Sequence, residues 1–225
     1  MFSLCFSKSL AGDRGINLDH AGHLSGDGWS LSYVIDGYVF ISDGKHYSSA
    51  LNEALRRLDD SRHYESIDVF LAALSGVMDE CKQYEGSASA AFVVYIKGLT
   101  HILSVGDTRV YQLKDKCRTV DDTVAQRMVD AGYSVGGVFN KHPYGRKLTK
   151  NIKSCESAFE LTLTSCCSDE VIICSDGFWH HFDSDDLIYQ IKSDECERVM
   201  GECIAGSGSD FRDDMTLVFL RSMAN

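Results

Sequence analysis

The chain has 225 residues, 44% of them hydrophobic, and its 22 Lys and Arg against 33 Asp and Glu give a formal charge of −11. This length supports one domain with a sizeable core. The acidic balance disfavours nucleic acid as the main partner and suits a protein that binds cations. The apolar patch at residues 2–6 is too short for a secretion signal, and no run approaches a membrane span. We therefore expect a single cytoplasmic domain over residues 1–225, monomeric, with no membrane partner.

The cysteine pattern points to a reducing compartment. The nine cysteines are odd in number and form no C-x-x-C pair, which argues against a disulfide framework and a zinc ribbon. Cys174 lies inside an apolar run, and the adjacent Cys166 and Cys167 have no nearby His or basic residue to stabilise a thiolate. None of these cysteines is expected to be catalytic.

The first half of the chain alternates loop, strand and helix signals. Residues 12–19 have loop composition, residues 29–35 read as a strand ending at Asp36-Gly37, and residues 38–42 as a short return strand. Apolar residues at spacings of three and four then predict two amphipathic helices, one at residues 47–58 and one capped by Ser66 that ends near residue 84.

From residue 88 the period changes to that of strands. β-Branched and aromatic runs predict an antiparallel meander of three strands, at residues 90–96, 99–105 and 109–113. The pattern then weakens into a short helix at residues 124–131, a Gly-Gly turn at 136–137 and the only proline, Pro143.

Residues 114–153 form a basic segment on an acidic chain. Nine Lys and Arg stand there against four Asp, a local charge of +5. Such a segment is a candidate docking surface for an anionic partner, and a solvated loop is the alternative.

The C-terminal third resumes the strands. The apolar run at residues 171–174 predicts a strand buried on both faces, and it stops at Asp176-Gly177. The remaining predicted elements are a strand at residues 161–163, a helix from Asp183 or Ser184 to Ile191, a helix at 195–205, a flexible loop at 206–209 and a strand at 215–220.

Several carboxylates recur at the ends of predicted strands. They are Asp36, Asp107, Asp176 and Asp213, with Asp19 in the N-terminal loop region. If these ends converge, each like-charged pair at ~4 Å costs about 4 kcal/mol at an effective dielectric of about 20, so the cluster needs divalent metal. Oxygen-only ligands indicate Mg²⁺ or Mn²⁺, and a paired site would activate a water for attack on phosphorus.

The sequence also resembles a known family, the metal-dependent (PPM, type 2C) serine/threonine protein phosphatases in their bacterial single-domain form. Six matching stretches come in the family's order and cover nearly the whole chain: Arg14-x-x-Asn17-x-Asp19, Val34-Ile35-Asp36-Gly37, Val105-Gly106-Asp107-Thr108-Arg109-Val110-Tyr111, Lys147-Leu148-Thr149-Lys150, Cys174-Ser175-Asp176-Gly177-Phe178 and Asp213-Asp214-Met215-Thr216. The resemblance implies an α+β fold, a central β-sandwich of two mainly antiparallel sheets flanked by helix pairs. It further implies that part of the basic segment is a flap beside the active site.

The resemblance also assigns roles to individual residues. Asp36, Asp176 and Asp213 would hold two Mn²⁺ or Mg²⁺ ions together with the Gly37 carbonyl. Asp19 would orient metal-bound water, and Arg14 would bind the substrate phosphate with its planar fork. The implied activity is hydrolysis of phosphoserine and phosphothreonine in proteins, and the expected partners are phosphorylated proteins, a serine/threonine kinase or its targets.

Three departures from the family pattern bear on activity. Leu18 stands where the family has an acid or Gln, Tyr38-Val39-Phe40 replaces small residues, His or Met and glycines, and His180 replaces a common Asp. Asp107 and His180 leave a third metal site open. The core carboxylates survive, so an active enzyme is the main hypothesis and a pseudophosphatase that binds phosphoproteins is the alternative.

A haloacid-dehalogenase phosphatase is a further rival. That class also places an Asp at the end of an apolar strand, as Val34-Ile35-Asp36 does, but it needs a second Asp two residues later. Position 38 is Tyr, which argues against this class.

Overall fold

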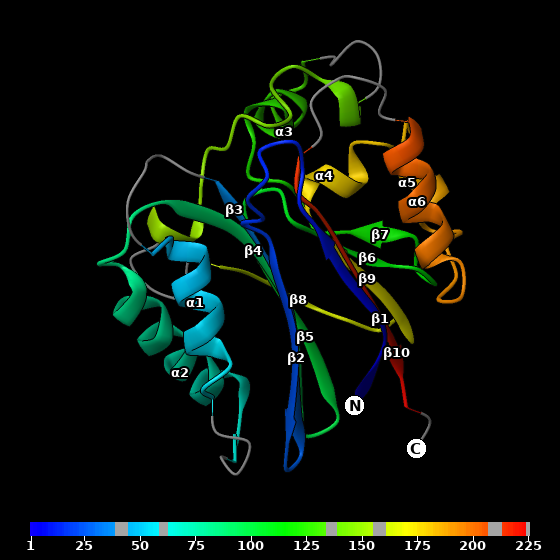
Figure 1. The fold of residues 1–225 in the computed structure, drawn as a ribbon. Coiled ribbons are helices and arrows are strands. Elements are labelled where there is room, and N and C mark those ends of the chain that lie inside the picture. Colours follow the sequence, from blue (N-terminus) through cyan, green and yellow to red (C-terminus); the bar gives the residue numbers. More distant parts are fainter. Residues whose placement is uncertain (39–44, 59–62, 134–138, 155–160, 207–212, 224–225) are drawn as a thin grey trace.

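Two five-stranded antiparallel sheets form the centre of the structure (Figure 1). The computed structural model describes residues 1–38, 45–58, 63–133, 139–154, 161–206 and 213–223. Sheet A has the strand order β1-β10-β9-β6-β7, and sheet B has the order β2-β3-β4-β5-β8. The predicted α+β class with a sandwich of antiparallel sheets is confirmed.

Each sheet is built from strands of both halves of the chain. The strands of sheet A are β1 (Phe2–Leu10), β6 (Arg109–Gln112), β7 (Cys117–Arg118), β9 (Glu170–Cys174) and β10 (Met215–Ser222). The strands of sheet B are β2 (His20–Gly26), β3 (Trp29–Tyr38), β4 (Ser87–Ile96), β5 (Leu99–Val105) and β8 (Thr162–Ser165). The α-helices are α1 (Tyr47–Leu55), α2 (Ile67–Cys81), α3 (Val124–Asp130), α4 (Asp176–Trp179), α5 (Asp185–Ile188) and α6 (Cys196–Gly206). Two 3₁₀ turns are η1 (Phe139–Lys141) and η2 (Ile152–Ser154).

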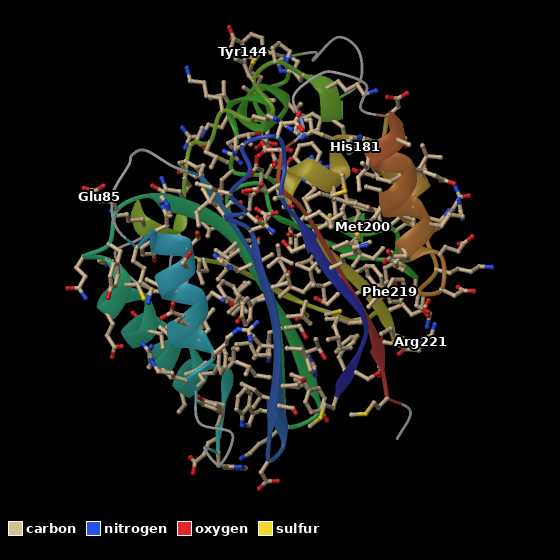
Figure 2. The ribbon with its side chains drawn as sticks, viewed as in Figure 1. Glu85, Tyr144, His181, Met200, Phe219 and Arg221 are labelled. Atoms are coloured by element: carbon tan, nitrogen blue, oxygen red, sulfur yellow. The ribbon has the colours of Figure 1, made fainter. Side chains whose placement is uncertain are left out.

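Three apolar layers hold these elements together. Between the sheets, β-branched side chains such as Val34 of β3 and Ile173 of β9 pack face to face. Helices α1 and α2 cover the outer face of sheet B, and α4, α5 and α6 cover that of sheet A (Figure 1). Met200 of α6 and Phe219 of β10 both belong to this last layer (Figure 2). Because each sheet is covered on both sides, β9 is buried on both faces, as its apolar run predicted.

Four sequence predictions are wrong about local structure. β1 and β2 were not predicted as strands, because both lie partly exposed and their polar residues hide the alternation. β3 does not end at Asp36-Gly37, since its pairing with β4 continues to Tyr38. The meander is broken because β6 leaves sheet B and pairs with β9 in sheet A. A short helix, α4, begins at Asp176, where no helix was predicted.

The other predicted elements lie close to their observed positions. Ser66 caps α2, accepting a hydrogen bond from the Val69 N–H, and Ser184 caps α5. Helix α1 ends at Leu55 instead of residue 58. The return strand from residue 39 onward, the turn at 136–137 and the loop from residue 207 lie outside the described residues. No described helix is both long and apolar enough to cross a membrane.

A buried arginine joins sheet A to the irregular region above it. Arg109 of β6 is fully buried and binds Asp121 through two hydrogen bonds of 2.9 and 2.6 Å. Its guanidinium carbon lies 3.5 Å from the ring centroid of Trp179 in α4, a cation–π contact. Arg109 also donates a hydrogen bond to the side-chain oxygen of Asn140 in η1. Strand β6, helix α4 and the turn η1 therefore depend on one cation.

We expect Arg109→Ala to destabilise the protein by about 3–5 kcal/mol, because it leaves Asp121 buried without its main partner. Urea unfolding followed by circular dichroism measures this. Arg198→Ala, which breaks exposed pairs with Glu195 and Glu202, is the control and should leave the midpoint unchanged. Equal urea midpoints for the two variants would show that the buried Arg109–Asp121 pair adds nothing to the free energy of unfolding.

Candidate active site

A pocket of about 410 Å³ lies where the two sheets approach each other at the end nearest α3 and α4. Its lining residues are Arg14, Asp36, Gly37, Tyr38, Ser89, Asp107, Arg146, Lys147, Leu148, Asp176 and Asp213. A larger cavity, about 680 Å³, lies beside Tyr189 at the opposite end of sheet A. Its acidic residues Asp169 and Glu170 already face Lys114 and Arg221, so the smaller pocket is the chemically distinctive one.

The structure brings together the residues predicted from the sequence. Six of the seven candidates line this pocket, namely Arg14, Asp36, Gly37, Asp107, Asp176 and Asp213. The seventh, Asp19, is 3% exposed and lies within electrostatic range of Asp36 and Asp176. Strand ends far apart in the sequence thus meet at one place.

Backbone contacts fix the distances between these segments. The Asp176 N–H donates a 3.4 Å hydrogen bond to Asp36 Oδ2 and so ties α4 to β3 across the sandwich. At Gly177 a Cβ would lie 2.0 Å from the carbonyl oxygen of Asp214, so only glycine lets α4 begin against the segment before β10. The Asp-Gly pair read from the sequence is therefore a packing requirement.

Burial and mutual repulsion raise the pKa of the pocket carboxylates. Desolvation is the main cause for Asp36 and Asp107, whose pKa values lie well above their usual range. Negative neighbours add to it, first Asp19 for Asp36 and first Asp176 for Asp107. Asp36 has some exposed area because it lines the pocket, yet protein and carboxylates surround it. The pKa of Asp213 is raised less, because Arg14 and Arg146 oppose the effects of burial and Asp176.

Asp19 is the most isolated of these acids. Burial raises its pKa to about 7, and Asp214 and Asp176 add repulsion. The hydroxyls of Ser175 and Thr216 lie near enough to lower the pKa, but among the described residues neither carboxylate oxygen has a hydrogen bond of normal geometry. A buried carboxylate without a partner is costly, so this side chain is suited to a bound cation or water.

Two arginines neutralise part of the cluster. Arg14 forms ion pairs with Asp213 and with Asp214, whose Oδ2 lies 3.3 Å from the Arg14 Nη2. Arg146, in the basic segment, places Nε 3.2 Å from Asp176 Oδ2 and Nη1 3.3 Å from Asp213 Oδ2. Arg146 therefore bridges two carboxylates that come from different strand ends.

His180 is a neutral member of the site. Burial, with Arg146 as the second cause, lowers the pKa of His180 to about 3. Its Nδ1 donates to the carbonyl oxygen of Asp176 at 3.1 Å, which leaves Nε2 to accept from Arg146 Nε at 3.4 Å. At neutral pH the imidazole does not compete as a cation.

The donor chemistry of the pocket fits divalent metal. Its acids offer only oxygen atoms, which suit Mg²⁺ or Mn²⁺, and Asp19 adds two unsatisfied oxygens beside them. In the described part of the chain, however, no three His, Cys, Asp or Glu side chains already surround a metal position. The arginine contacts of Asp176 and Asp213 are consistent with this, because they occupy oxygens that a metal would use.

Sequence reasoning gave no site role to five lining residues, Tyr38, Ser89, Arg146, Lys147 and Leu148, or to Asp214 beside the pocket. Asp214 accepts hydrogen bonds from the Gly12 and Leu18 N–H groups at 2.8 and 2.9 Å and so holds the N-terminal loop. Its adjacency to Asp213 was the available signal. Arg146 was noted only as part of a basic segment, and Ser89 gave no signal.

The basic segment is partly neutralised within the molecule. Lys141 pairs with Asp183, and Arg146 pairs with the pocket acids.

No described cysteine lines the pocket, and burial raises the pKa of the Cys174 thiol far above its usual range. The pocket chemistry therefore rests on carboxylates and arginines.

We predict that the EDTA-treated protein loses stability as the pH rises. A carboxyl whose folded pKa is raised stabilises the folded state below its unfolded pKa, about 4, and loses this contribution as the pH passes its folded pKa, about 7 for Asp19. Asp19→Asn should remove part of this fall, on the order of 2–4 kcal/mol between pH 4 and 8. Thermal unfolding across that range measures it.

The exposed Asp27→Asn is the matched control and should keep the wild-type dependence on pH. If Asp19→Asn also keeps the wild-type dependence of stability on pH, the pKa of Asp19 is not raised in the metal-free protein.

Comparisons with known proteins identify the fold. No protein-family model matches the sequence, and neither does any curated protein. Among solved structures, the chain is similar to the serine/threonine phosphatase Stp1 from Staphylococcus aureus, with a TM-score of 0.79, 15% identity and coverage of 100% of this chain and 96% of that one. The Mycobacterium tuberculosis serine/threonine phosphatase PstP/Ppp gives 0.76, 22% identity and 99% of both chains.

A second structure, of the PstP catalytic domain with two manganese ions, gives a TM-score of 0.75 at 22% identity over 98% of this chain and 97% of that one. A PPM Ser-Thr phosphatase from Mycobacterium smegmatis gives 0.73 at 18% identity over 97% of each chain. Each of these similarities spans nearly the full length of both compared chains. The chain therefore has the fold of the PPM-type serine/threonine phosphatases.

Proposed function

We propose that this protein is a metal-dependent phosphatase that hydrolyses phosphoserine and phosphothreonine in proteins. The observation that carries the proposal is one pocket in which four carboxylates and two guanidinium groups converge from separate segments. An acidic pocket repels a phosphate, so phosphoryl chemistry there requires cations. The serine/threonine phosphatases that share the fold support the choice of substrate class.

Asp36, Asp176 and Asp213 would hold two Mn²⁺ or Mg²⁺ ions with the carbonyl oxygen of Gly37, and Asp107 would serve a third. When bound, such ions supply Lewis-acid activation of water and neutralise the phosphoryl oxygens. The structure of a similar phosphatase domain with two manganese ions supports this number.

Arg14 would bind the substrate phosphate. Its guanidinium lies at the pocket wall and is oriented by Asp213 and Asp214. Asp214 is itself fixed by two backbone N–H groups, so the planar fork of Arg14 is held before substrate arrives.

Asp19 would orient the attacking water. Both of its oxygens are buried and unsatisfied, so they can accept hydrogen bonds from a water in the pocket. Bound divalent cations would favour the carboxylate form of Asp19 and lower its pKa from about 7, which would prepare it as an acceptor at neutral pH. Phosphorylated proteins, such as a serine/threonine kinase or its targets, are the proposed partners.

A catalytically silent phosphoprotein-binding module is the second candidate. The bridge from Arg146 to Asp176 and Asp213 favours it, because the cluster is partly neutralised without metal. His180 accepts a hydrogen bond from Arg146 and so supports this bridge, at a position where the PPM phosphatases commonly have Asp.

We predict Mn²⁺-dependent hydrolysis of a small aryl phosphate, abolished by EDTA. Asp36→Asn, Asp176→Asn and Asp213→Asn should each lower kcat by about 100-fold or more, because each removes a charge from the shared cluster and keeps the side-chain shape. Initial rates at saturating Mn²⁺ measure this, with circular dichroism to show that each variant folds.

Asp27→Asn, at an exposed site, should keep wild-type turnover. Mn²⁺-dependent turnover that survives in any of the three variants removes that residue from the metal-binding set. No turnover in the wild type, together with retained binding of a phosphopeptide, favours the binding module.

A further inference from the structure

Arg146 places its positive charge between two carboxylates of the pocket. It contacts Asp176 through Nε and Asp213 through Nη1, at 3.2 and 3.3 Å. Asp176 follows β9 and Asp213 precedes β10 in sheet A, and burial together with repulsion from Asp176 raises the pKa of Asp213. The guanidinium thus joins two groups that would otherwise repel.

The neighbouring imidazole completes the arginine site. His180 Nδ1 is committed to the Asp176 carbonyl oxygen, so Nε2 is left as an acceptor, and Arg146 Nε lies 3.4 Å from it. His180 in turn stacks on Trp179, with ring centroids 3.9 Å apart. His180 thus gives the guanidinium a third, uncharged acceptor beside the two carboxylates.

The backbone on both sides of Arg146 is anchored to α3 and the loop before it. The carbonyl oxygens of Tyr144 and Lys147 accept from the N–H groups of Ala125 and Val124, at 3.3 and 2.9 Å. Thr149 N–H donates to the Asp122 carbonyl oxygen at 2.8 Å. Arg146 is therefore delivered by a supported turn, whose exposed Tyr144 lies at the outer end of the molecule (Figure 2).

We propose that Arg146 is a resident cation of the metal-free cluster, the one that bridges Asp176 and Asp213, and that a divalent ion bound by these two acids displaces its guanidinium and loosens residues 142–150. This inference rests on the proposed metal-dependent function and adds a regulation to it. A guanidinium and a divalent ion repel each other and use the same carboxylate oxygens, so both cannot keep their contacts. Metal affinity and the position of this segment are then coupled, each opposing the other.

The first test is titration of the metal-free protein with Mn²⁺ by isothermal calorimetry. Arg146→Gln removes the competing charge, so it should bind Mn²⁺ about 10-fold or more tightly than the wild type, and Arg146→Lys should lie between them. Lys141→Gln is the matched control, because it removes one positive charge whose partner is Asp183, outside the pocket. Its affinity should stay within about 2-fold of the wild type.

The second test is hydrogen–deuterium exchange over residues 142–150. In the wild type, Mn²⁺ should speed exchange there, and in Arg146→Gln the exchange should already be fast and unchanged by Mn²⁺. Circular dichroism establishes that the variants fold, and Arg146→Lys keeps the test usable if Arg146→Gln does not.

The outcomes separate the two proposals. If the wild type binds Mn²⁺ and Arg146→Gln binds no more tightly, the displacement model is overturned and the metal-dependent function stands. If only the variants bind Mn²⁺, displacement is supported and metal-dependent catalysis by the natural chain is overturned. If no form binds Mn²⁺, both are overturned.

Discussion

Repulsion among buried carboxylates is the constraint on which the rest of this structure depends. Asp36, Asp107, Asp176 and Asp213 line one pocket, and Asp19 lies buried behind them. Each pair at ~4 Å costs about 4 kcal/mol at an effective dielectric of about 20, far more than a surface ion pair returns. The protein meets this cost with protonation at raised pKa values, with the guanidinium groups of Arg14 and Arg146, and with space that suits divalent cations.

At this end of the molecule the β-sandwich holds the crowded carboxylates in fixed positions. Three apolar layers hold the sheets and their covering helices, so the strand ends cannot separate to relieve the repulsion. Arg109 and Trp179 extend the frame beneath the pocket, and the indole N–H of Trp179 donates to the Asp107 carbonyl oxygen at 2.9 Å. The site therefore combines residues of packed elements, such as Asp36 and Asp176, with residues of loops, such as Asp107 and Asp213.

Two of the departures from the family pattern lie beside the arginines of the pocket. His180 cannot add negative charge beside Asp176, and its neutral ring accepts from Arg146 instead. Leu18 contributes a backbone N–H to Asp214, which in turn holds Arg14. Two arginines thus contact the acids of the pocket, Arg14 at Asp213 and Arg146 at Asp176 and Asp213.

The sequence by itself determined the features that rest on local pattern. The Ser66 cap, the amphipathic α1 and α2, the doubly buried β9 and the Asp-Gly positions follow from residues within a few places of one another. Ordered motifs added the fold and six of the pocket residues. Tertiary structure alone decided the half-exposed β1, the crossing of β6 to the other sheet, and the contact of Arg146 with Asp176. These features depend on which strands pair across long loops and on side chains that meet in space, and non-local pairing leaves no periodic mark in the sequence.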